Sequence, residues 1–241
     1  MFEVLRKAFP NASDSNIELF GPIISDAMAR YEVNTPLRKA HYLAQLGHET
    51  AELRYREEIA SGAAYEWRRD LGNIQKGDGI KFKGRGHGML TGRYNYTKYD
   101  EFRGDSKKYI LRPELVSEED FTCADTWGWY WATKRLNEYA DKDSILTVTR
   151  IVNGGYNGLD DRKRLLALAK DALAVTSDPS HNHRVQRLLV AAGYDIGLHG
   201  VDGVIGKYTR LAVIAFQRAH DLLPDGIPGK NTLRLLEKYD D

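Results

Sequence analysis

Two glutamates nine residues apart, Glu49 and Glu58, have the side chains needed for paired acid–base chemistry. Hydrolysis of a glycosidic bond needs one carboxylic acid to protonate the leaving oxygen and a second carboxylate that attacks or activates water. On one unbroken helix, nine residues turn through about 900° and place the two side chains on opposite faces. The pair can therefore act together only if the helix ends between Thr50 and Arg56 and the chain turns back.

This acidic segment also has a plainer interpretation. Glutamates and arginines between residues 52 and 58 are typical of a solvated charged surface. His48 beside Glu49 suggests a zinc-protease motif, but no second histidine follows at the HExxH spacing. We therefore expect no bound metal and no cofactor, and we expect His48 to pack beside the site and orient its neighbours.

Two further segments carry groups that can bind a sugar: FKGRGHGMLTGRYNY at 82–96 and IVNGGYNGLDDR at 151–162. Glycines let backbone amides approach a sugar ring. Arg85 can hold a carboxylate, the Thr91 hydroxyl can hold a water molecule, and the Asn153 amide can bond an N-acetyl group. The GxxxxGK[ST] spacing of a phosphate loop is missing, which disfavours nucleotide binding. An ordinary glycine turn remains the alternative.

Apolar residues at three- and four-residue spacing predict the helices that must position these groups. They are Ser15–Arg30, Pro36–Leu53, Glu118–Leu136 and Ser144–Val152. The segment Gly62–Asp105 has little helical periodicity and predicts loops with a short hairpin. The candidates for cleft walls are the tyrosines of that segment, Tyr94, Tyr96 and Tyr99. Sugar stacking is one interpretation of the four aromatic residues of the helix near 127–131, but they point in different directions, so core packing is expected for Trp127, Trp129, Tyr130 and Trp131.

Composition narrows the class of protein. The 241 residues suffice for one medium core and a small module, and 42% hydrophobic with 29% charged residues is typical of a globular protein. A formal charge of +1 argues against nucleic acid as the partner. The single cysteine, Cys123, excludes an intramolecular disulfide, and its apolar neighbours predict an inert buried thiol.

The N-terminal residues lack the basic start, apolar region and cleavage site of a signal peptide. No stretch approaches the roughly 18 apolar residues of a membrane span. We therefore expect the protein to be made and kept in the cytoplasm unless something other than a signal peptide releases it, with no stable membrane insertion, and to be a monomer.

The C-terminal region contains an internal repeat of the form D-G-x-x-G-K-x-T, starting at Asp202 and again at Asp225. The Asp-Gly pairs predict turns, and the threonines can begin helices. A polar run suggests a linker at 177–183 between a domain at 1–176 and a second one at 184–241. The helices predicted for the second domain are Val185–Ala192, Tyr208–Ala219 and Asn231–Lys238.

The ordered blocks GHET, Glu58, GRGHGMLTGRYNY and VNGGYNGLDDR resemble glycoside hydrolase family 19, specifically its branch of bacteriophage endolysins. The resemblance covers about residues 36–174 and implies an α-helical, lysozyme-like domain. It implies that Glu49 is the general acid, Glu58 the general base and Thr91 the residue that positions water. It also implies that Asn153 binds substrate.

The resemblance implies further roles for residues around these four. Arg85 is similar to a residue of the structural and cleft shell, and Arg162 to a buried charge partner. The family usually has a glutamine where this chain has Met89, and Met89 cannot make amide hydrogen bonds. We expect His87 to supply a substitute contact, with Tyr96 as a further substrate-binding wall.

The C-terminal repeats, together with Val185-Gln186 and Ala215-Phe216-Gln217, resemble the peptidoglycan-binding domain of bacterial and phage wall hydrolases. The alternative is a small helical dimerisation module. The resemblance implies that the wall is bound between the two repeats, by Asp202, Gly203, Thr209, Asp225, Gly226 and Thr232.

These observations together predict an endolysin that cleaves β-1,4-glycosidic bonds of bacterial peptidoglycan by inversion and so lyses the host cell. Cytoplasmic storage until a membrane lesion allows release to the wall is the matching localisation. The alternatives are a chitinase of the same family, a non-catalytic wall-binding lysis protein, and an amidase or peptidase acting on the stem peptide. The last class normally needs zinc ligands or a Cys/His pair, and neither is arranged in this sequence.

Overall fold

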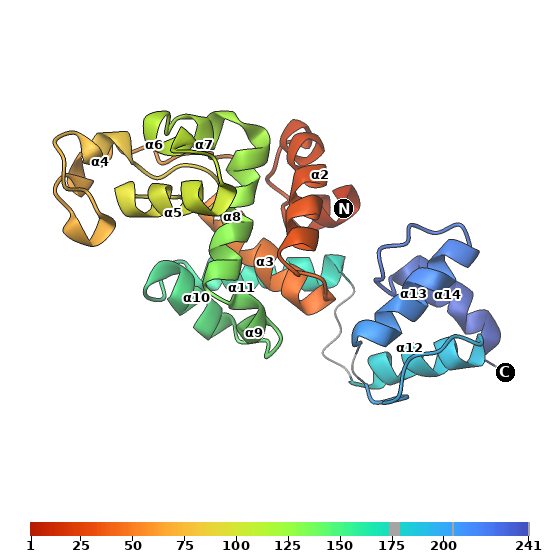
Figure 1. Cartoon of the computed structure of the whole chain (residues 1–241). Coiled ribbons are helices and arrows are strands. Elements are labelled where there is room, and N and C mark those ends of the chain that lie inside the picture. The colour runs from red at the N-terminus through yellow and green to blue at the C-terminus, as the bar shows by residue number, and fades with distance from the viewer. Residues whose placement is uncertain (174–178, 204, 241) are drawn as a thin grey trace.

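The structure, a computed structural model, describes residues 1–173, 179–203 and 205–240. Regular structure in these residues is almost entirely helical, as Figure 1 shows. The mainly α fold predicted from the periodicity is therefore confirmed. Within the same ranges, β pairing is limited to isolated bridges from Arg85 to Glu57 and to Leu90. These bridges stand where a short hairpin was expected.

The larger, N-terminal group of helices carries the catalytic candidates. Its α-helices in chain order are α1 (Phe2–Ala8), α2 (Asp14–Arg30), α3 (Pro36–Glu49), α4 (Asp78–Lys81), α5 (Arg93–Arg103), α6 (Lys108–Leu111), α7 (Leu115–Glu118), α8 (Asp120–Thr133), α9 (Leu136–Ala140), α10 (Ile145–Asn153) and α11 (Leu159–Ala172). Two short 3₁₀ helices, η1 (Ala63–Tyr65) and η2 (Arg69–Leu71), precede α4.

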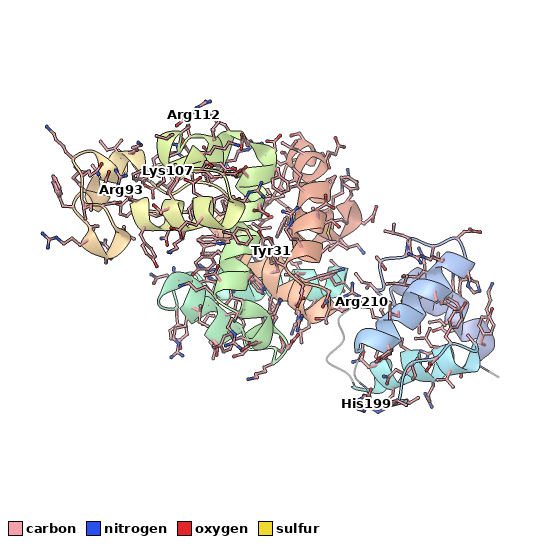
Figure 2. All side chains as sticks on the ribbon, in the orientation of Figure 1. Tyr31, Arg93, Lys107, Arg112, His199 and Arg210 are labelled. Atoms are coloured by element: carbon pink, nitrogen blue, oxygen red, sulfur yellow. The ribbon has the colours of Figure 1, made fainter. Side chains whose placement is uncertain are left out.

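Helix α3 lies at the centre of the main hydrophobic core. It begins at Pro36, and the Thr35 side chain accepts from the Arg38 backbone N–H at 3.1 Å, which caps the first turn. Helix α11 packs along α3, α1 packs on α11, and α2 packs against α8. At the end of α2, Tyr31 points into this assembly (Figure 2) and donates to Asp125 of α8 at 2.9 Å.

Helix α3 stops at Glu49, four residues before the predicted end, because Thr50 terminates it. The Thr50 hydroxyl donates to the Leu46 carbonyl at 2.7 Å and accepts from the Leu53 N–H at 2.8 Å. The next three residues are all left-handed, with φ of 48° at Ala51, 58° at Glu52 and 69° at Leu53. The chain reversal that joint action of the two glutamates requires is thus present just past Thr50.

A second, smaller core lies under the glycine-rich segment. It consists of Phe82, Leu90, Tyr96, Tyr99, Tyr109 and Val116. Helix α5 forms one side of it, so the prediction of loops throughout this segment was wrong. The helix escapes notice in the sequence because only Tyr96, Tyr99 and Asp100 are buried, whereas the rest of its surface is polar or exposed. Trp129 of α8 packs against both cores and so connects them.

The C-terminal helices are α12 (Pro179–Ala191), α13 (Lys207–Ala219), α14 (Lys230–Leu236) and the short η3 (Glu237–Tyr239). They enclose a core of their own that includes Leu188, Val213 and Phe216. The expected linker at 177–183 is partly wrong, because α12 already begins at Pro179; residues 177 and 178 lie outside the described residues. The three predicted helices are present, and each of their ends lies within six residues of the predicted end.

The aromatic helix α8 is largely core, as expected. Trp127 and Trp131 are fully buried, whereas Trp129 is half-buried. Burial raises the pKa of Cys123 to about 12, which agrees with an inert thiol. Across the described ranges, no helix combines the length and apolar character needed to cross a membrane.

Candidate active site

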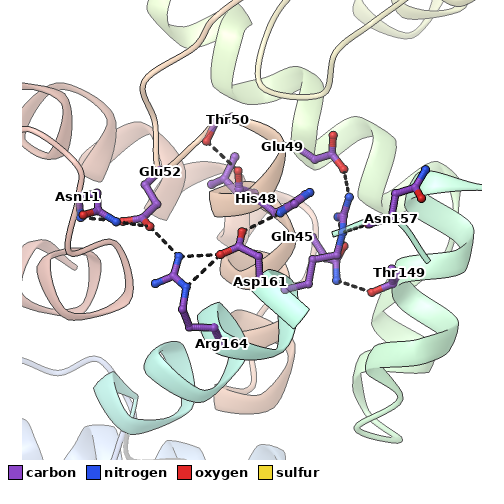
Figure 3. Close-up of polar contacts among 12 residues, drawn as sticks. Asn11, Gln45, His48, Glu49, Thr50, Glu52, Thr149, Asn157, Asp161 and Arg164 are labelled. Carbon is purple, nitrogen blue, oxygen red and sulfur yellow. Dashed lines mark hydrogen bonds and ion pairs between the residues drawn. The ribbon is translucent and has the colours of Figure 1, made fainter. Parts of the chain in front are cut away.

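Glu49, the last residue of α3, meets a buried arginine. Arg162 of α11 donates from Nη2 to Glu49 Oε1 at 2.5 Å (Figure 3). The Arg162 side chain is 1% exposed and that of Glu49 is 24% exposed. A second Arg162 nitrogen donates to Gln45, which lies one turn before Glu49 and donates to Thr149 at 3.3 Å. One carboxyl oxygen of Glu49 is therefore fixed from the core while the side chain still reaches solvent.

A second polar network holds the reversed chain after α3 (Figure 3). Glu52 accepts from the Asn11 backbone at 2.7 Å and from Arg164 at 2.9 Å. Arg164 also binds Asp161, which bonds the Nδ1 atom of His48 at 2.7 Å. Burial alone raises the pKa of Asp161, but the bonds from His48 and Arg164 hold it below its usual value. His48 thus ties α3 to α11 beside the site.

Glu58 follows the reversal and is anchored through one carboxylate oxygen. Its backbone N–H donates to the Gly84 carbonyl at 3.0 Å, and the Tyr65 hydroxyl donates to Oε2 at 2.9 Å. Burial and then the Glu58 charge raise the pKa of Tyr65. The other oxygen, Oε1, is buried and has no hydrogen-bond partner among the described residues. A carboxylate held in this way has one oxygen left to accept a proton.

Thr91 lies close to Glu58, with Gly84 between them. A Cβ added to Gly84 would stand 3.1 Å from Glu58 Oε2 and 3.2 Å from Thr91 Oγ1. The Thr91 hydroxyl donates to the Met89 carbonyl at 2.7 Å, so its lone pairs can accept from a water molecule. The structure therefore brings together a carboxylate and a hydroxyl that could hold one water between them.

A pocket of about 490 Å³ lies beside these residues, between α5 and the C-terminal end of α8. Its lining includes Met89, Asn95, Lys98, Trp129, Tyr130 and Lys134. Asn95 donates to the Thr91 carbonyl at 2.7 Å, which connects the pocket to the Glu58 side. On the other side, burial and the charge of Glu49 raise the pKa of Tyr130 to about 12. Asn95 and Tyr130 thus link the pocket to the surroundings of Thr91 and of Glu49, although neither glutamate lines it.

Asn153 ends α10 and is exposed. Its Oδ1 accepts from the Asn157 backbone at 3.3 Å, which leaves its NH₂ group available. The Tyr130 hydroxyl donates to the carbonyl of Ile151 at 3.1 Å and so joins this loop to the pocket wall. Asn153 is accessible as a substrate contact requires, and its role stays a prediction.

Three residues expected to contact the sugar are too deeply buried to do so. His87 is fully buried, with its ring 4.5 Å from that of Phe20. Tyr96 is also fully buried, and Arg85, 9% exposed, donates to the Tyr96 hydroxyl at 3.1 Å. These side chains hold the glycine-rich segment from below. His87 therefore does not replace the amide that Met89 lacks.

In the first C-terminal repeat, the residues of the D-G-x-x-G-K-x-T pattern are held together by a buried glutamine. Gln186 donates to Asp202 at 2.7 Å and to Thr209 at 3.3 Å, and it accepts from the Gly203 N–H at 2.7 Å. Thr209 is 2% exposed. The expected wall contact by Thr209 is therefore wrong. Asp202 and Gly203 hold the turn in place through Gln186, and their contact with the wall stays a prediction.

The second repeat reproduces this arrangement. Gln217 donates to Asp225 at 2.8 Å and to Thr232 at 3.2 Å, and it accepts from the Gly226 N–H at 2.9 Å. Thr232 and Gly226 are buried, so neither the Thr232 side chain nor the Gly226 backbone is exposed to contact the wall. The repeated sequence pattern thus encodes two copies of one turn clamp.

Two contributors were missed in the sequence. Gln45 stands one helical turn before Glu49, and this spacing was available as a signal. Tyr65 gives no local signal, because only the folded chain brings it to Glu58.

Comparison with known proteins finds similar sequences and similar folds. Residues 183–236 match the family described as "Putative peptidoglycan binding domain". A Haemophilus influenzae protein, "Glycosyl hydrolase family 19 domain-containing protein", is 29% identical over 160 residues, which cover 54% of this chain and 76% of that protein. The structure of chitinase C from Streptomyces griseus HUT6037 is similar with a TM-score of 0.60 and 19% identity, covering 74% of this chain and 94% of that one. A bacterial family 19 chitinase is similar with a TM-score of 0.56 and 20% identity, covering 70% and 94%.

In sequence and in fold the N-terminal part of the chain is therefore similar to family 19 glycoside hydrolases, which supports a glycoside hydrolase. The resemblance to glycoside hydrolase family 19 is confirmed, and so is the C-terminal peptidoglycan-binding domain.

Proposed function

We propose that this protein is an endolysin that hydrolyses β-1,4-glycosidic bonds of bacterial peptidoglycan with inversion at the anomeric carbon. The observation that carries the proposal is the different anchoring of the two glutamates. Glu49 is held by a buried arginine, and Glu58 by a tyrosine that leaves Oε1 unpaired. Residues 1–176 would form the catalytic domain and residues 184–241 the wall-binding domain.

In the proposed reaction, protonated Glu49 donates its proton to the glycosidic oxygen as the bond to the anomeric carbon breaks. A water molecule held by Thr91 attacks that carbon from the opposite face, and Glu58 Oε1 accepts its proton. Glu49 ends ionised and Glu58 protonated, and exchange with solvent restores both. The anchoring of each carboxylate through one oxygen leaves the other oxygen of each available for the proton that the reaction moves.

The C-terminal domain supports peptidoglycan as the substrate. Tethering to an insoluble wall raises the local concentration of the catalytic domain even if each binding event is weak. Storage in the host cytoplasm and release through a membrane lesion complete the proposal.

The test is mass spectrometry of purified sacculi digested by the wild type, Glu49→Gln and Glu58→Gln. We expect new reducing ends from the wild type only, with folding and sacculus binding retained in both variants. Reducing ends on N-acetylmuramic acid would mean a muramidase, and those on N-acetylglucosamine a glucosaminidase. Turnover retained by either variant, or release of free stem peptides, would contradict the proposed mechanism.

A chitinase is the second candidate, because the similar solved structures are described as chitinases. Hydrolysis of neutral N-acetylglucosamine oligomers without any attack on sacculi would favour it.

A further inference from the structure

The pocket between α5 and the C-terminal end of α8 has a one-sided charge. Lys98 and Lys134 both line it, and none of the residues that line it in the described chain is acidic. Lys98 extends from α5, and Lys134 follows the end of α8, so the two ammonium groups approach from different helices. Both side chains are exposed, and no ion pair of Lys134 occurs within the part of the chain that the structure describes.

The two lysines lie against the aromatic walls of the pocket rather than away from it. Lys98 Nζ is 5.8 Å from the Tyr94 ring centroid, and Lys134 Nζ is 5.7 Å from that of Tyr130. Lys98 also donates to Glu101 at 2.8 Å, and the carboxylate of this exposed ion pair partly neutralises the Lys98 charge. Lys134 therefore supplies the less compensated positive charge, and Lys98 adds to it.

The remaining lining is suited to an amino sugar. Trp129 and Tyr130 offer aromatic faces, on which a pyranose ring can pack. Asn95 provides a side-chain amide, although its NH₂ group already donates to Thr91. Met89 adds apolar surface where an N-acetyl methyl group can lie. The pocket thus combines sugar-binding surface with positive charge, and a neutral sugar would use only the first.

Resting on the proposed function, we infer that this pocket binds the carboxylate-bearing side arm of the muramyl residue and so makes the site selective for peptidoglycan over chitin. Muramyl residues carry a lactyl group that ends in a carboxylate or continues into a stem peptide with carboxylates. N-acetylglucosamine carries neither. Lys134, assisted by Lys98, would pair with that carboxylate while the sugar ring packs on Trp129.

The test measures binding of soluble probes to the full chain by calorimetry. The probes are the N-acetylglucosaminyl–N-acetylmuramic acid disaccharide with a free lactyl carboxylate, the same disaccharide as its lactyl carboxamide, and the disaccharide extended by a short peptide with a terminal carboxylate. Wild type should bind the lactyl acid about five-fold more tightly than the carboxamide, the scale of one exposed ion pair. The peptide probe distinguishes a lactyl carboxylate from a stem-peptide carboxylate as the bound group.

In the double variant Lys98→Met/Lys134→Met, either acid probe should bind about as tightly as the carboxamide, so the preference is lost. The matched control, Lys142→Met, removes an exposed lysine outside the pocket and should keep it. High salt should also reduce the preference in the wild type. Equal affinity of wild type for all three probes, or a preference that survives the double substitution, would overturn the inference.

Sacculus hydrolysis, measured separately, keeps the two proposals distinct. Hydrolysis without any preference for the acids removes the pocket assignment and leaves the proposed function standing. A preference for the acids that depends on the lysines, without hydrolysis of sacculi, keeps the pocket assignment and removes the proposed function.

Discussion

Arg162 donates to Glu49 from a position that solvent hardly reaches, whereas Glu49 itself remains 24% exposed. The ion pair therefore crosses the boundary between the main core and the cleft. Because Arg162 is also bonded to Gln45, its guanidinium has little freedom to follow movements of the carboxylate. The core thus determines where one oxygen of Glu49 can lie.

Replacing Arg162 with methionine is expected to damage both stability and turnover. The change removes a buried cation and leaves the Gln45 Oε1 atom without the Arg162 donor. Together these losses should cost about 2–4 kcal/mol of unfolding free energy. Loss of the anchor should lower kcat on soluble wall glycans by about 100-fold. Urea unfolding and reducing-end assays measure the two effects. Arg135→Met, at an exposed arginine, should stay within about 0.5 kcal/mol of wild type. Full activity in the Arg162 variant would show that the anchor is dispensable.

Gly84→Ala separates geometry from stability. The added methyl group would stand 3.1 Å from Glu58 Oε2 and 3.2 Å from Thr91 Oγ1, so each must move by a few tenths of an ångström. Since these groups flank the proposed water position, we expect about a ten-fold fall in kcat with less than about 1 kcal/mol lost in stability. Gly229→Ala, where the added atom meets nothing within 4 Å, is the control and should leave kcat on soluble glycans unchanged. A Gly84 variant as active as the control would remove Glu58 and Thr91 from the reacting centre.

Helices α3, α8 and α10 were predictable because their apolar periodicity follows from burial on one face, whereas α5 was not. The reversal after α3 was predictable only as a condition, since no glycine or proline marks it. Left-handed φ at three consecutive non-glycine residues is unfavourable, by roughly 1 kcal/mol each. It persists because Glu52 is held by Asn11 and Arg164, which are 41 and 112 residues away in sequence. No local pattern contains that information.

The errors concern polar residues whose burial the sequence does not reveal. His87 stands between two glycines and Thr209 three residues after Gly206, in motifs expected to contact a ligand, yet both are buried. A glycine allows close approach of a ligand and close packing of the chain on itself equally well. In this fold the glycines allow close packing of the chain on itself, and Arg85 and Tyr96 are buried in that packing as well.

Gln217→Leu tests whether the C-terminal repeats are structural clamps. The substitution would leave Asp225, Thr232 and the Gly226 N–H without their shared partner. We expect a loss of about 2–4 kcal/mol confined to the C-terminal domain, seen by calorimetry as an earlier transition. Sacculus binding by co-sedimentation should fall, while turnover of short soluble glycans should not. Val190→Ala, at an exposed position of α12, serves as the control. Unchanged calorimetry in the Gln217 variant would mean that the clamp contributes little.

His87 should make the stability of the protein sensitive to acid. Burial, with a smaller effect of the Arg56 charge, lowers the pKa of His87 from 6.5 to about 3, and neither ring nitrogen has a partner among the described residues. As pH falls below about 6.5 the unfolded chain takes up a proton at this histidine and the folded chain does not, so stability present above that pH is lost progressively down to about 3. At pH 5 the loss attributable to His87 is about 2 kcal/mol. His87→Met should therefore show a shallower fall in urea midpoint between pH 7.5 and 5 than the wild type, with the pH 7.5 value isolating any change in packing. Identical slopes for the two proteins would mean that His87 takes up its proton as readily in the folded chain as in the unfolded one and would contradict the prediction.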